Sequence, residues 1–555
     1  MKSKLILSIC LIFTINNNNV FAQDRYVVHF SNKNNSPYSI NNPLQYLSQR
    51  AIDRRTKQGI TIDQSDFPVN PSYLNGVSAT GAVILNTSRW LNTVTVQITN
   101  PAQLNAISAL SYVSSVGNVG RYGHQKNSKE KFDDEKIILP TINSSVYLRT
   151  NSFNYGQATG QTQMIAMDAL HNLGYAGEGM MIALLDGGFK DANIMPALDS
   201  VFANNQVVAT WDFVSNDANV YDDNWHGASV FSCIAANVPG EMVGTAPHAQ
   251  FLLLRSEDVS SEYIIEEYNY AAAAEYADSA GADVIHSSLG YTTFDDASQN
   301  HTYADMNGNT APATIAADLA AKKGIIVTTS AGNEGTRAWN YISVPADGDS
   351  VLAIGAIDQQ GMYSSFSSNG PSYDGRVKPD VAAVGGGTFL YMPFNPSVVQ
   401  ANGTSFSGPI IAGAAACLWQ SWPTKKNMEI AQAIKRSANQ FFNPDTLLGY
   451  GIPNFNTAYT VLSIGEVNFP YNESLHIYPN PAEKGNTINA YYFSTLKDKI
   501  QITLTDAAGR VIMNESTVVN AGYTSIIIPK LMSTGMYLLN IQSDKINVTK
   551  RFIVK

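Results

Sequence analysis

The stretch MIALLDGGF, residues 181–189, decides the fold of the largest part of the chain. Its first five residues are apolar without strict alternation, and they end at Asp186, which two glycines follow. Such a run is typical of a strand that helices cover on both faces. An acidic residue directly after such a strand lies at the carboxyl edge of the sheet, where α/β proteins place their sites.

Similar short apolar runs recur along the chain, at residues 250–255, 283–286, 325–329 and 351–354. Helix-like stretches at 263–280 and 314–323 separate them, which gives the strand–helix alternation of a parallel sheet. We therefore predict an α/β body over residues 156–462, built as a parallel sheet with flanking helices.

The regions on either side of this body have different patterns. A basic start, an apolar run and small residues before Gln23 predict a signal peptide at 1–22. Residues 23–121 alternate between strand-like and helix-like runs and predict an α+β domain. Residues 122–155 are polar and charged without periodicity, so we expect an exposed linker in which the chain is easily cut. Short strands and turns over 465–555 predict a small β-sandwich.

The overall composition narrows the function. The chain has 555 residues and a formal net charge of −10. This acidic excess argues against nucleic acid as a partner, because phosphate binding needs clustered Lys and Arg. No apolar run outside the first residues is long enough for a transmembrane segment. Cys10 belongs to the signal peptide, and Cys233 and Cys417 lie in apolar helix-like stretches, which favours buried free thiols.

Three side chains in separate motifs have complementary chemistry. Asp186 ends the first strand of the body, His226 opens the helix-like HGASVFSCIAA, and Ser405 lies in NGTSFSGPIIAG. Each alone has an ordinary explanation as a cap or turn residue. Together they meet the needs of nucleophilic catalysis, because a hydroxyl needs an imidazole to take its proton and the imidazole needs an orienting carboxylate.

These motifs, with GTAPHAQFLLLR, VIHSSLG and TTSAGNEG, resemble those of the subtilisin-like serine peptidases over residues 157–461. The chain order Asp, His, Ser is also that of the family. The resemblance implies an endopeptidase that hydrolyses peptide bonds through a Ser acyl-enzyme and needs no cofactor for the chemistry. It assigns Asp186, His226 and Ser405 as the catalytic triad and Asn333 as the donor to the oxyanion.

The resemblance also implies how a polypeptide substrate is bound. The matching positions are Ser288, Leu289 and Gly290 in the edge segment that pairs with extended substrate, and Ser330, Ala331 and Gly332 in one wall of the first substrate pocket. Backbone pairing of this kind suits unfolded or flexible polypeptides. Calcium is common in the family, but no Asp-rich loop, such as 217–223, matches a ligand pattern, so structural calcium stays an open alternative.

The chain departs from the family at a few positions. Gly187 stands where Ser or Thr is usual, Ala228 replaces a Thr, and Phe406 with Ser407 replaces Met-Ala. His286 stands where an Asn is often found. None of these changes removes a proton carrier or an oxyanion donor, so they bear on positioning and rate.

The flanking regions carry resemblances of their own. Residues 23–121 have the order of the family propeptide, which implies the chain's own propeptide as a partner; a permanent accessory domain is the alternative. IYPNPAEKGN, LTDAAGRVI, STGMYLLNI and KRFIVK resemble the C-terminal sorting domain of the type IX secretion pathway, with a carbohydrate- or surface-binding β-module as the alternative. The expected route is Sec export and then passage through the outer membrane of a Gram-negative bacterium, giving a secreted or surface-attached monomer.

Two other functions fit the same motifs. One is a catalytically inactive subtilisin-like domain that serves as a surface-binding module. The other is a relative that transfers the acyl group to an amine, as in peptide macrocyclisation. Product mass distinguishes them, because hydrolysis adds a water and cyclisation does not.

Overall fold

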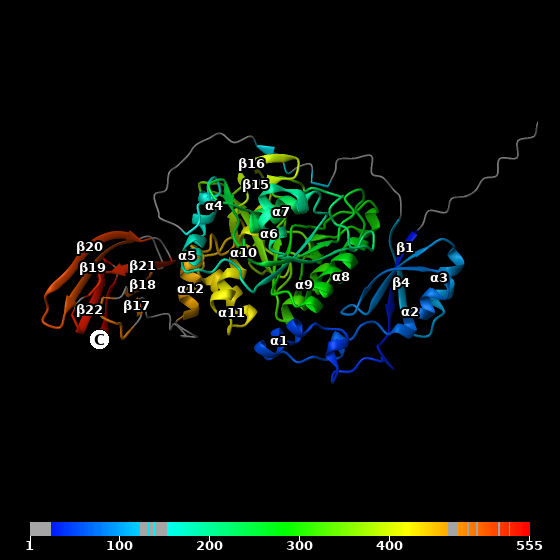
Figure 1. The fold of residues 1–555 in the computed structure, drawn as a ribbon, viewed down its shortest axis with the longest axis horizontal. Coiled ribbons are helices and arrows are strands. Elements are labelled where there is room, and N and C mark those ends of the chain that lie inside the picture. Colours follow the sequence, from blue (N-terminus) through cyan, green and yellow to red (C-terminus); the bar gives the residue numbers. More distant parts are fainter. Residues whose placement is uncertain are drawn as a thin grey trace, which may run out of the picture.

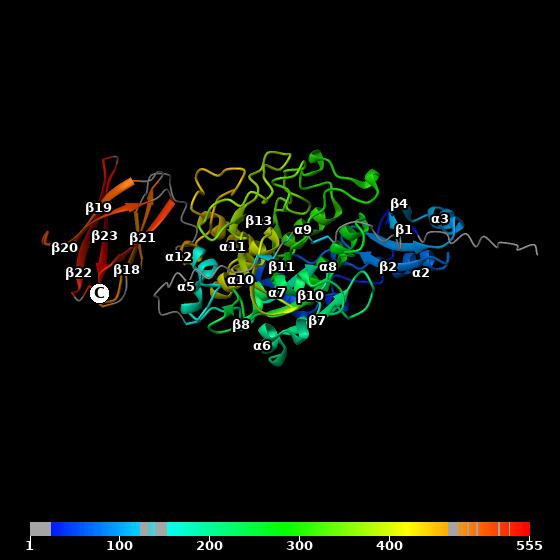
Figure 2. The same cartoon turned by 90° about the horizontal axis from the view of Figure 1, so that it is seen from above.

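The computed structural model describes residues 24–121, 131–132, 135, 137–138, 152–463, 475–478, 480–485, 488–494, 498–519, 522–531, 533–544 and 546–555. The predicted signal peptide and most of the predicted linker lie outside these residues. Figures 1 and 2 show a large central body with an N-terminal domain, in blue, at one end and a C-terminal β domain, in orange and red, at the other.

The body is built on a seven-stranded sheet in which every neighbouring pair is parallel. Its order is β14 (Val381–Val384), β13 (Leu352–Ile357), β12 (Ile326–Ser330), β11 (Val284–Ser287), β6 (Met181–Asp186), β10 (Gln250–Arg255) and β7 (Val207–Asp212). The predicted α/β architecture is confirmed.

Helices cover both faces of this sheet, as β6 illustrates. Ile182 and Leu184 point to the cluster of α7 (His226–Ala235) and α10 (Thr404–Ser421). The alternate residues Ala183 and Leu185 pack with α8 (Ile265–Ala280) and α9 (Pro312–Lys322). All six residues of β6 are buried, which explains why its sequence is apolar without alternation.

The order of the strands places the site. The chain leaves β6 for β7 and β10 on one side, and then builds β11 to β14 on the other. The carboxyl end of β6 is therefore a point at which the strand order reverses, and ligands of α/β sheets bind at such points. Asp186 is the last residue of β6.

The remaining elements complete the body. They are α4 (Thr159–Met164), α5 (Met167–Asn172), α6 (Asp199–Ala203), β8 (Asn237–Val238), β9 (Met242–Val243), β15 (Thr388–Met392), β16 (Asn395–Ala401), α11 (Asn427–Arg436) and α12 (Phe455–Ser463). Cys233 in α7 and Cys417 in α10 are buried free thiols, so that prediction is confirmed.

The N-terminal domain is a four-stranded antiparallel sheet with helices, as predicted. Its elements are β1 (Asp24–Phe30), α1 (Gln49–Gln58), α2 (Pro71–Ser78), β2 (Val83–Ser88), β3 (Thr93–Ile98), α3 (Pro101–Ser108) and β4 (Val113–Arg121). Residues 43–59 have a helix-like sequence throughout, but they form a short 3₁₀ turn at Pro43–Gln45 and a separate helix α1 that starts only at Gln49. Ser48 begins it, since its side chain accepts a hydrogen bond from the Ala51 N–H.

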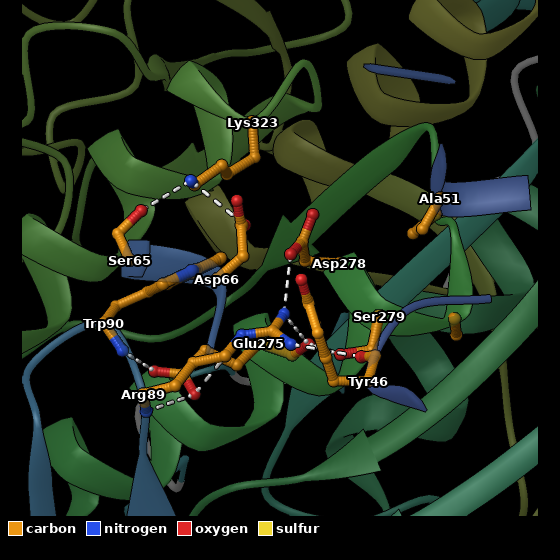
Figure 3. Close-up of polar contacts among 12 residues, drawn as sticks. Tyr46, Ala51, Ser65, Asp66, Arg89, Trp90, Glu275, Asp278, Ser279 and Lys323 are labelled. Carbon is orange, nitrogen blue, oxygen red and sulfur yellow. Dashed lines mark hydrogen bonds and ion pairs between the residues drawn. The ribbon is translucent and has the colours of Figure 1, made fainter. Parts of the chain in front are cut away.

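The N-terminal domain is joined to α8 of the body by buried ion pairs (Figure 3). One carboxylate oxygen of Asp278 lies 2.7 Å from the guanidinium group of Arg55 and 2.6 Å from that of Arg89. The other oxygen pairs with Arg54. One turn earlier, Glu275 accepts hydrogen bonds from the main chain of Arg89 at 2.8 Å and from two neighbouring groups. Burial opposes charge on Asp278, but the three guanidinium groups outweigh it and lower its pKa.

The C-terminal domain is a sandwich of two antiparallel sheets, as predicted. One contains β17 (Leu475–Tyr478), β18 (Ile488–Ser494) and β21 (Gly522–Ile528). The other contains β20 (Val511–Val519), β19 (Asp498–Asp506), β22 (Gly535–Gln542) and β23 (Asn547–Val554). Side chains of both sheets form one core, to which Ile488, Ile500 and Leu539 belong.

Candidate active site

Asp186 and His226 meet at the carboxyl edge of the sheet. The Nδ1 of His226 lies 2.8 Å from the Asp186 carboxylate, and both side chains are completely buried. His226 is the first residue of α7, and its backbone N–H donates to the side chain of Asn224 at 2.9 Å, which fixes the start of the helix. Burial raises the pKa of Asp186 even though His226 favours its charged form.

Ser405 and Asn333 lie at the same edge. Ser405 is the second residue of α10, and Asn333 follows β12 in the loop that comes after Ser330. The Asn333 carbonyl accepts hydrogen bonds from the Thr404 N–H at 2.9 Å and the Thr404 hydroxyl at 3.0 Å. These bonds fix the orientation of the amide, so its NH₂ group points away from α10 and into the site.

A single carboxylate, that of Glu135, contacts Ser405, His226 and Asn333. Its Oε1 accepts a hydrogen bond from the Ser405 hydroxyl at 2.6 Å and another from Asn333 Nδ2 at 3.1 Å. Its Oε2 lies 2.8 Å from His226 Nε2. The hydroxyl, the imidazole and the amide therefore converge on one point.

The two carboxylates on His226 set its protonation state. Each ring nitrogen has a carboxylate oxygen as its partner, so a doubly protonated ring donates to both. Burial acts to lower the pKa of His226, but the charges of Asp186 and Glu135 outweigh it and raise this pKa to about 10. The imidazole is therefore an imidazolium at neutral pH while Glu135 is in place.

Glu135 belongs to the segment predicted as an exposed linker, and that prediction is wrong at Phe132 and Glu135, which are both buried, whereas Ser152 and Asn154 are exposed. Phe132 is buried and its ring stacks on His226, with centroids 3.8 Å apart and planes 7° from parallel. Ile137 and Ile138 form β5, which pairs with β16. His226, Asn333 and Ser405 of the body are the partners of this segment, so its polar composition alone could not reveal its position.

Glu135 is the site residue that the sequence reasoning missed. A signal was present, since Phe132 interrupts a charged run and the apolar 137–139 follows it. An isolated aromatic residue beside a short apolar run indicates a segment in which a few side chains pack against the rest of the protein. A fully solvated linker lacks such side chains.

The predicted substrate-binding residues lie around the same centre. The Ser288 hydroxyl donates to the Ser405 carbonyl at 2.8 Å, Leu289 is buried, and Gly290 is exposed directly after them. On the other side, Ser330 and Ala331 are buried and the Gly332 N–H donates to the Thr404 hydroxyl at 3.3 Å.

The departures from the family have local explanations. A side chain at Gly187 would place its Cβ 3.1 Å from the ring of Phe132, so glycine leaves room for that ring. His286 bonds to Ser288 and to Thr328, and burial lowers its pKa to about 3, so it is a neutral link between strands. A Cβ at Gly408 would lie 2.5 Å from His286, so the helix α10 packs closely against it. Ala228, Phe406 and Ser407 are buried.

Within the described part of the chain, no group of three or more His, Cys, Asp or Glu side chains is arranged to hold a metal ion. In the Asp-rich loop 217–223, Asp217 and Asp222 accept hydrogen bonds from Asn219, and Asp223 pairs with Arg255 at 2.9 Å. Among the same described residues, no helix combines the length and the apolar character needed to span a membrane.

Comparison with known families agrees with this arrangement of domains. Residues 177–451 match the subtilase family, peptidase S8. Residues 25–134 match the peptidase S8 propeptide domain of Bacteroidota, and this match ends one residue before Glu135. Residues 476–555 match a secretion system C-terminal sorting domain.

Individual relatives are also subtilisins and similar proteinases. Subtilisin E of Bacillus subtilis (strain 168) is 30% identical over 341 residues, which are 60% of this chain and 78% of that protein. The thermophilic serine proteinase of Bacillus sp. (strain AK1) is 32% identical over 288 residues, 51% of this chain and 62% of that protein. The chain therefore belongs to the subtilase family: it is a subtilisin-like serine peptidase with a propeptide domain and a C-terminal sorting domain.

Proposed function

We propose that this chain is a secreted serine endopeptidase with Asp186, His226 and Ser405 as its triad and Asn333 as its oxyanion donor. The observation that carries the proposal is the convergence of Ser405, His226 and Asn333 on the Glu135 carboxylate. Glu135 Oε1 accepts from both the nucleophile and the amide, and so stands in for the oxygen that becomes negative during acyl transfer.

The reaction follows from this geometry once a substrate replaces Glu135. The Ser405 oxygen bonds to the scissile carbonyl carbon and gives its proton to His226 Nε2, which then passes it to the leaving amine. Asp186 holds the ring through Nδ1 and stabilises the imidazolium that forms. Water then attacks the acyl-enzyme in the same way and releases the new carboxylate. The position of Ser405 in the first turn of α10 adds the positive end of the helix dipole.

The same contacts imply that the full chain is a latent precursor. Glu135 occupies the place of the substrate carbonyl and holds His226 as an imidazolium, which has no free lone pair to take the proton of Ser405. Activity therefore requires that Phe132 and Glu135 leave His226 and Ser405. Once Glu135 is gone, one of the two charges that raise the His226 pKa is lost and the pKa falls.

Substrate and location follow from the remaining parts. The edge segment Ser288, Leu289 and Gly290 supports binding of extended polypeptide, so unfolded or flexible chains are the proposed substrates. The sorting domain over 476–555 supports export by the type IX pathway, to the medium or the cell surface. The inactive binding module and the acyl-transferring enzyme remain the competing functions, and no specific contact favours either of them.

The pH profile tests the role of His226. For the chain freed of its N-terminal part, hydrolysis of an unfolded protein is expected to fall as pH drops through roughly 6.5, because protonation removes the base. Initial rates at pH 4.5 to 9 on a reduced and alkylated protein measure this, and product masses show whether each cut adds one water. Near-UV circular dichroism at each pH serves as the folding control. Full activity at pH 4.5 contradicts the assignment, and cyclic or amine-linked products favour acyl transfer.

A further inference from the structure

Beside the catalytic centre lies a pocket for a positive charge, made by Glu257, Glu262, Glu266 and Tyr291. The ammonium group of Lys131 occupies it. It lies 3.0 Å from Glu262 and 2.8 Å from Glu266, and it also contacts Glu257. The Tyr291 ring forms a wall, with its centroid 5.5 Å from the ammonium nitrogen.

The pocket matches the ammonium group of a lysine in the number of its hydrogen-bond acceptors as well as in the sign of its charge. An ammonium group has three N–H donors, and three separate carboxylates each offer an acceptor. The orientation of two of them is fixed, because the Tyr291 hydroxyl donates to Glu257 and the Asp258 N–H donates to Glu266 at 3.2 Å. A flexible surface cluster would lack such supports.

The pocket is buried in the precursor, where Lys131 fills it, and burial makes charge on its carboxylates costly. The side chains of Glu257 and Glu266 are 0% and 1% exposed, and that of Glu262 is 15% exposed. Burial and the nearby charge of Glu257 raise the pKa of Glu266 well above its usual range. Lys131 acts in the opposite direction and favours the charged carboxylates, so once Lys131 leaves, the pocket either takes up a proton or pairs with a new cation.

The pocket lies where a substrate would pass. Glu257 follows β10 by two residues, and its Cβ lies 3.6 Å from where a Cβ on Gly187, next to Asp186, would be. Tyr291 directly follows Gly290 of the proposed edge segment. The chain runs from Lys131 in the pocket through Phe132 on His226 to Glu135 at the nucleophile.

We propose that Glu257, Glu262, Glu266 and Tyr291 form a specificity subsite that selects a lysine side chain on the N-terminal side of the bond to be cleaved. This inference rests on the proposed function. Lys131 then occupies, in the precursor, the subsite that a lysine of the substrate occupies in the active peptidase. We assign the N-terminal side because Lys131 precedes Glu135, whose carboxylate takes the place of the scissile carbonyl. The assay measures the distance from the scissile bond, because a turn that bonds the Glu135 N–H to the Phe132 carbonyl shortens the path.

Peptide hydrolysis tests the subsite directly. The chain is produced whole and cut between residue 138 and the body. The N-terminal part, which then includes Lys131 and Glu135, is removed. The body is then assayed with fluorogenic peptides of one sequence that carry either lysine or methionine at each of the four positions before the scissile bond. At one position, kcat/KM for lysine is expected to exceed that for methionine by about 10²-fold, because methionine leaves the buried carboxylates unpaired.

Variants of the pocket show whether it causes the preference. Glu262→Gln and Glu266→Gln are each expected to lower the lysine-to-methionine ratio by about tenfold or more, with little change for the methionine peptide. Glu262 is the most exposed of the three, so its variant poses the smaller risk to folding. Asp258→Asn is the matched control, because it removes one negative charge next to the pocket. Among the ion pairs of the described residues, Asp258 does not pair with Lys131. This variant is expected to keep the full ratio.

Two results overturn the subsite and leave the proposed function standing: equal rates for lysine and methionine at all four positions, or an unchanged ratio in both glutamate variants. If no peptide is cleaved at all, the proposed function fails first. The subsite is then decided by calorimetry with a peptide of residues 129–138 and its Lys131→Met form. Weaker binding of the Lys131→Met peptide supports the pocket, and equal binding overturns it.

Discussion

Replacing Ser405 by alanine is expected to lower kcat for peptide hydrolysis by about 10⁶-fold, the size of loss known for the nucleophile of subtilisin itself. The reason is that Ser405 is the proposed nucleophile, and among the described residues its hydroxyl is the only one that donates a hydrogen bond to Glu135. The measurement is the rate of hydrolysis of an unfolded protein by the chain freed of its N-terminal part. A residual rate above that in water is expected from the oxyanion donor and substrate binding.

Ser407→Ala is the matched control for this experiment. Ser407 lies two residues further along α10 and is also buried, but its hydroxyl donates to the Thr404 carbonyl within the helix. Its loss is expected to leave kcat within a few-fold of the original. If Ser405→Ala and Ser407→Ala have the same activity, Ser405 is not the nucleophile. If the unaltered chain also hydrolyses nothing, the surface-binding module becomes the better account.

Replacing Asp278 by asparagine is expected to weaken the binding of the N-terminal domain to the body by about 10²- to 10⁴-fold. Asparagine keeps the shape but removes the charge that Arg54, Arg55 and Arg89 share. Breaking a buried pair by removing one partner costs about 3–5 kcal/mol. Here, among the described residues, Arg54 loses its ion-pair partner, while Arg55 and Arg89 keep only Asp66 and Glu275. The dissociation constant of the cut N-terminal part, measured by its inhibition of the body, reports this directly.

Asp374→Asn is a suitable control for the interface. Asp374 is an exposed aspartate of the body that pairs with Arg376, so its loss is expected to leave the inhibition constant unchanged. Peptidase activity of the freed body is expected to be unchanged in Asp278→Asn, since Asp278 lies on α8, away from the triad. An inhibition constant that stays the same in Asp278→Asn contradicts the role given to the buried ion pairs in holding the propeptide domain.

The sheet, and the meeting of Asp186, His226 and Ser405 at one edge of it, could be predicted from the sequence, because both depend on local sequence patterns. β10 matches its apolar run residue for residue, because a strand buried on both faces needs that run. Asp186, His226 and Ser405 could be expected together because each lies at the edge of a strand or the start of a helix, where the carboxyl edge of one parallel sheet collects them.

What the sequence could not predict depends on contacts between distant segments. Glu135 looked like one charge among many, and only the cleft of the body makes it a substitute for substrate. Glu266 stands in the first turn of α8, where an acidic residue is common because it suits the helix dipole. Its proposed role in a lysine pocket becomes visible only in the structure, where Lys131, from the segment that precedes the body, contacts it.

Covalent labelling of the precursor tests the central claim most directly, namely that Ser405 is the nucleophile and that Glu135 blocks it. A fluorophosphonate forms a bond from phosphorus to the serine oxygen and releases fluoride. We predict one label per chain, on Ser405 by peptide mapping, and faster labelling of Glu135→Ala than of the unaltered full chain or of the control Glu178→Ala, an exposed glutamate that pairs with His248. A label on another residue, or equal rates for all three full-length chains, would contradict the account.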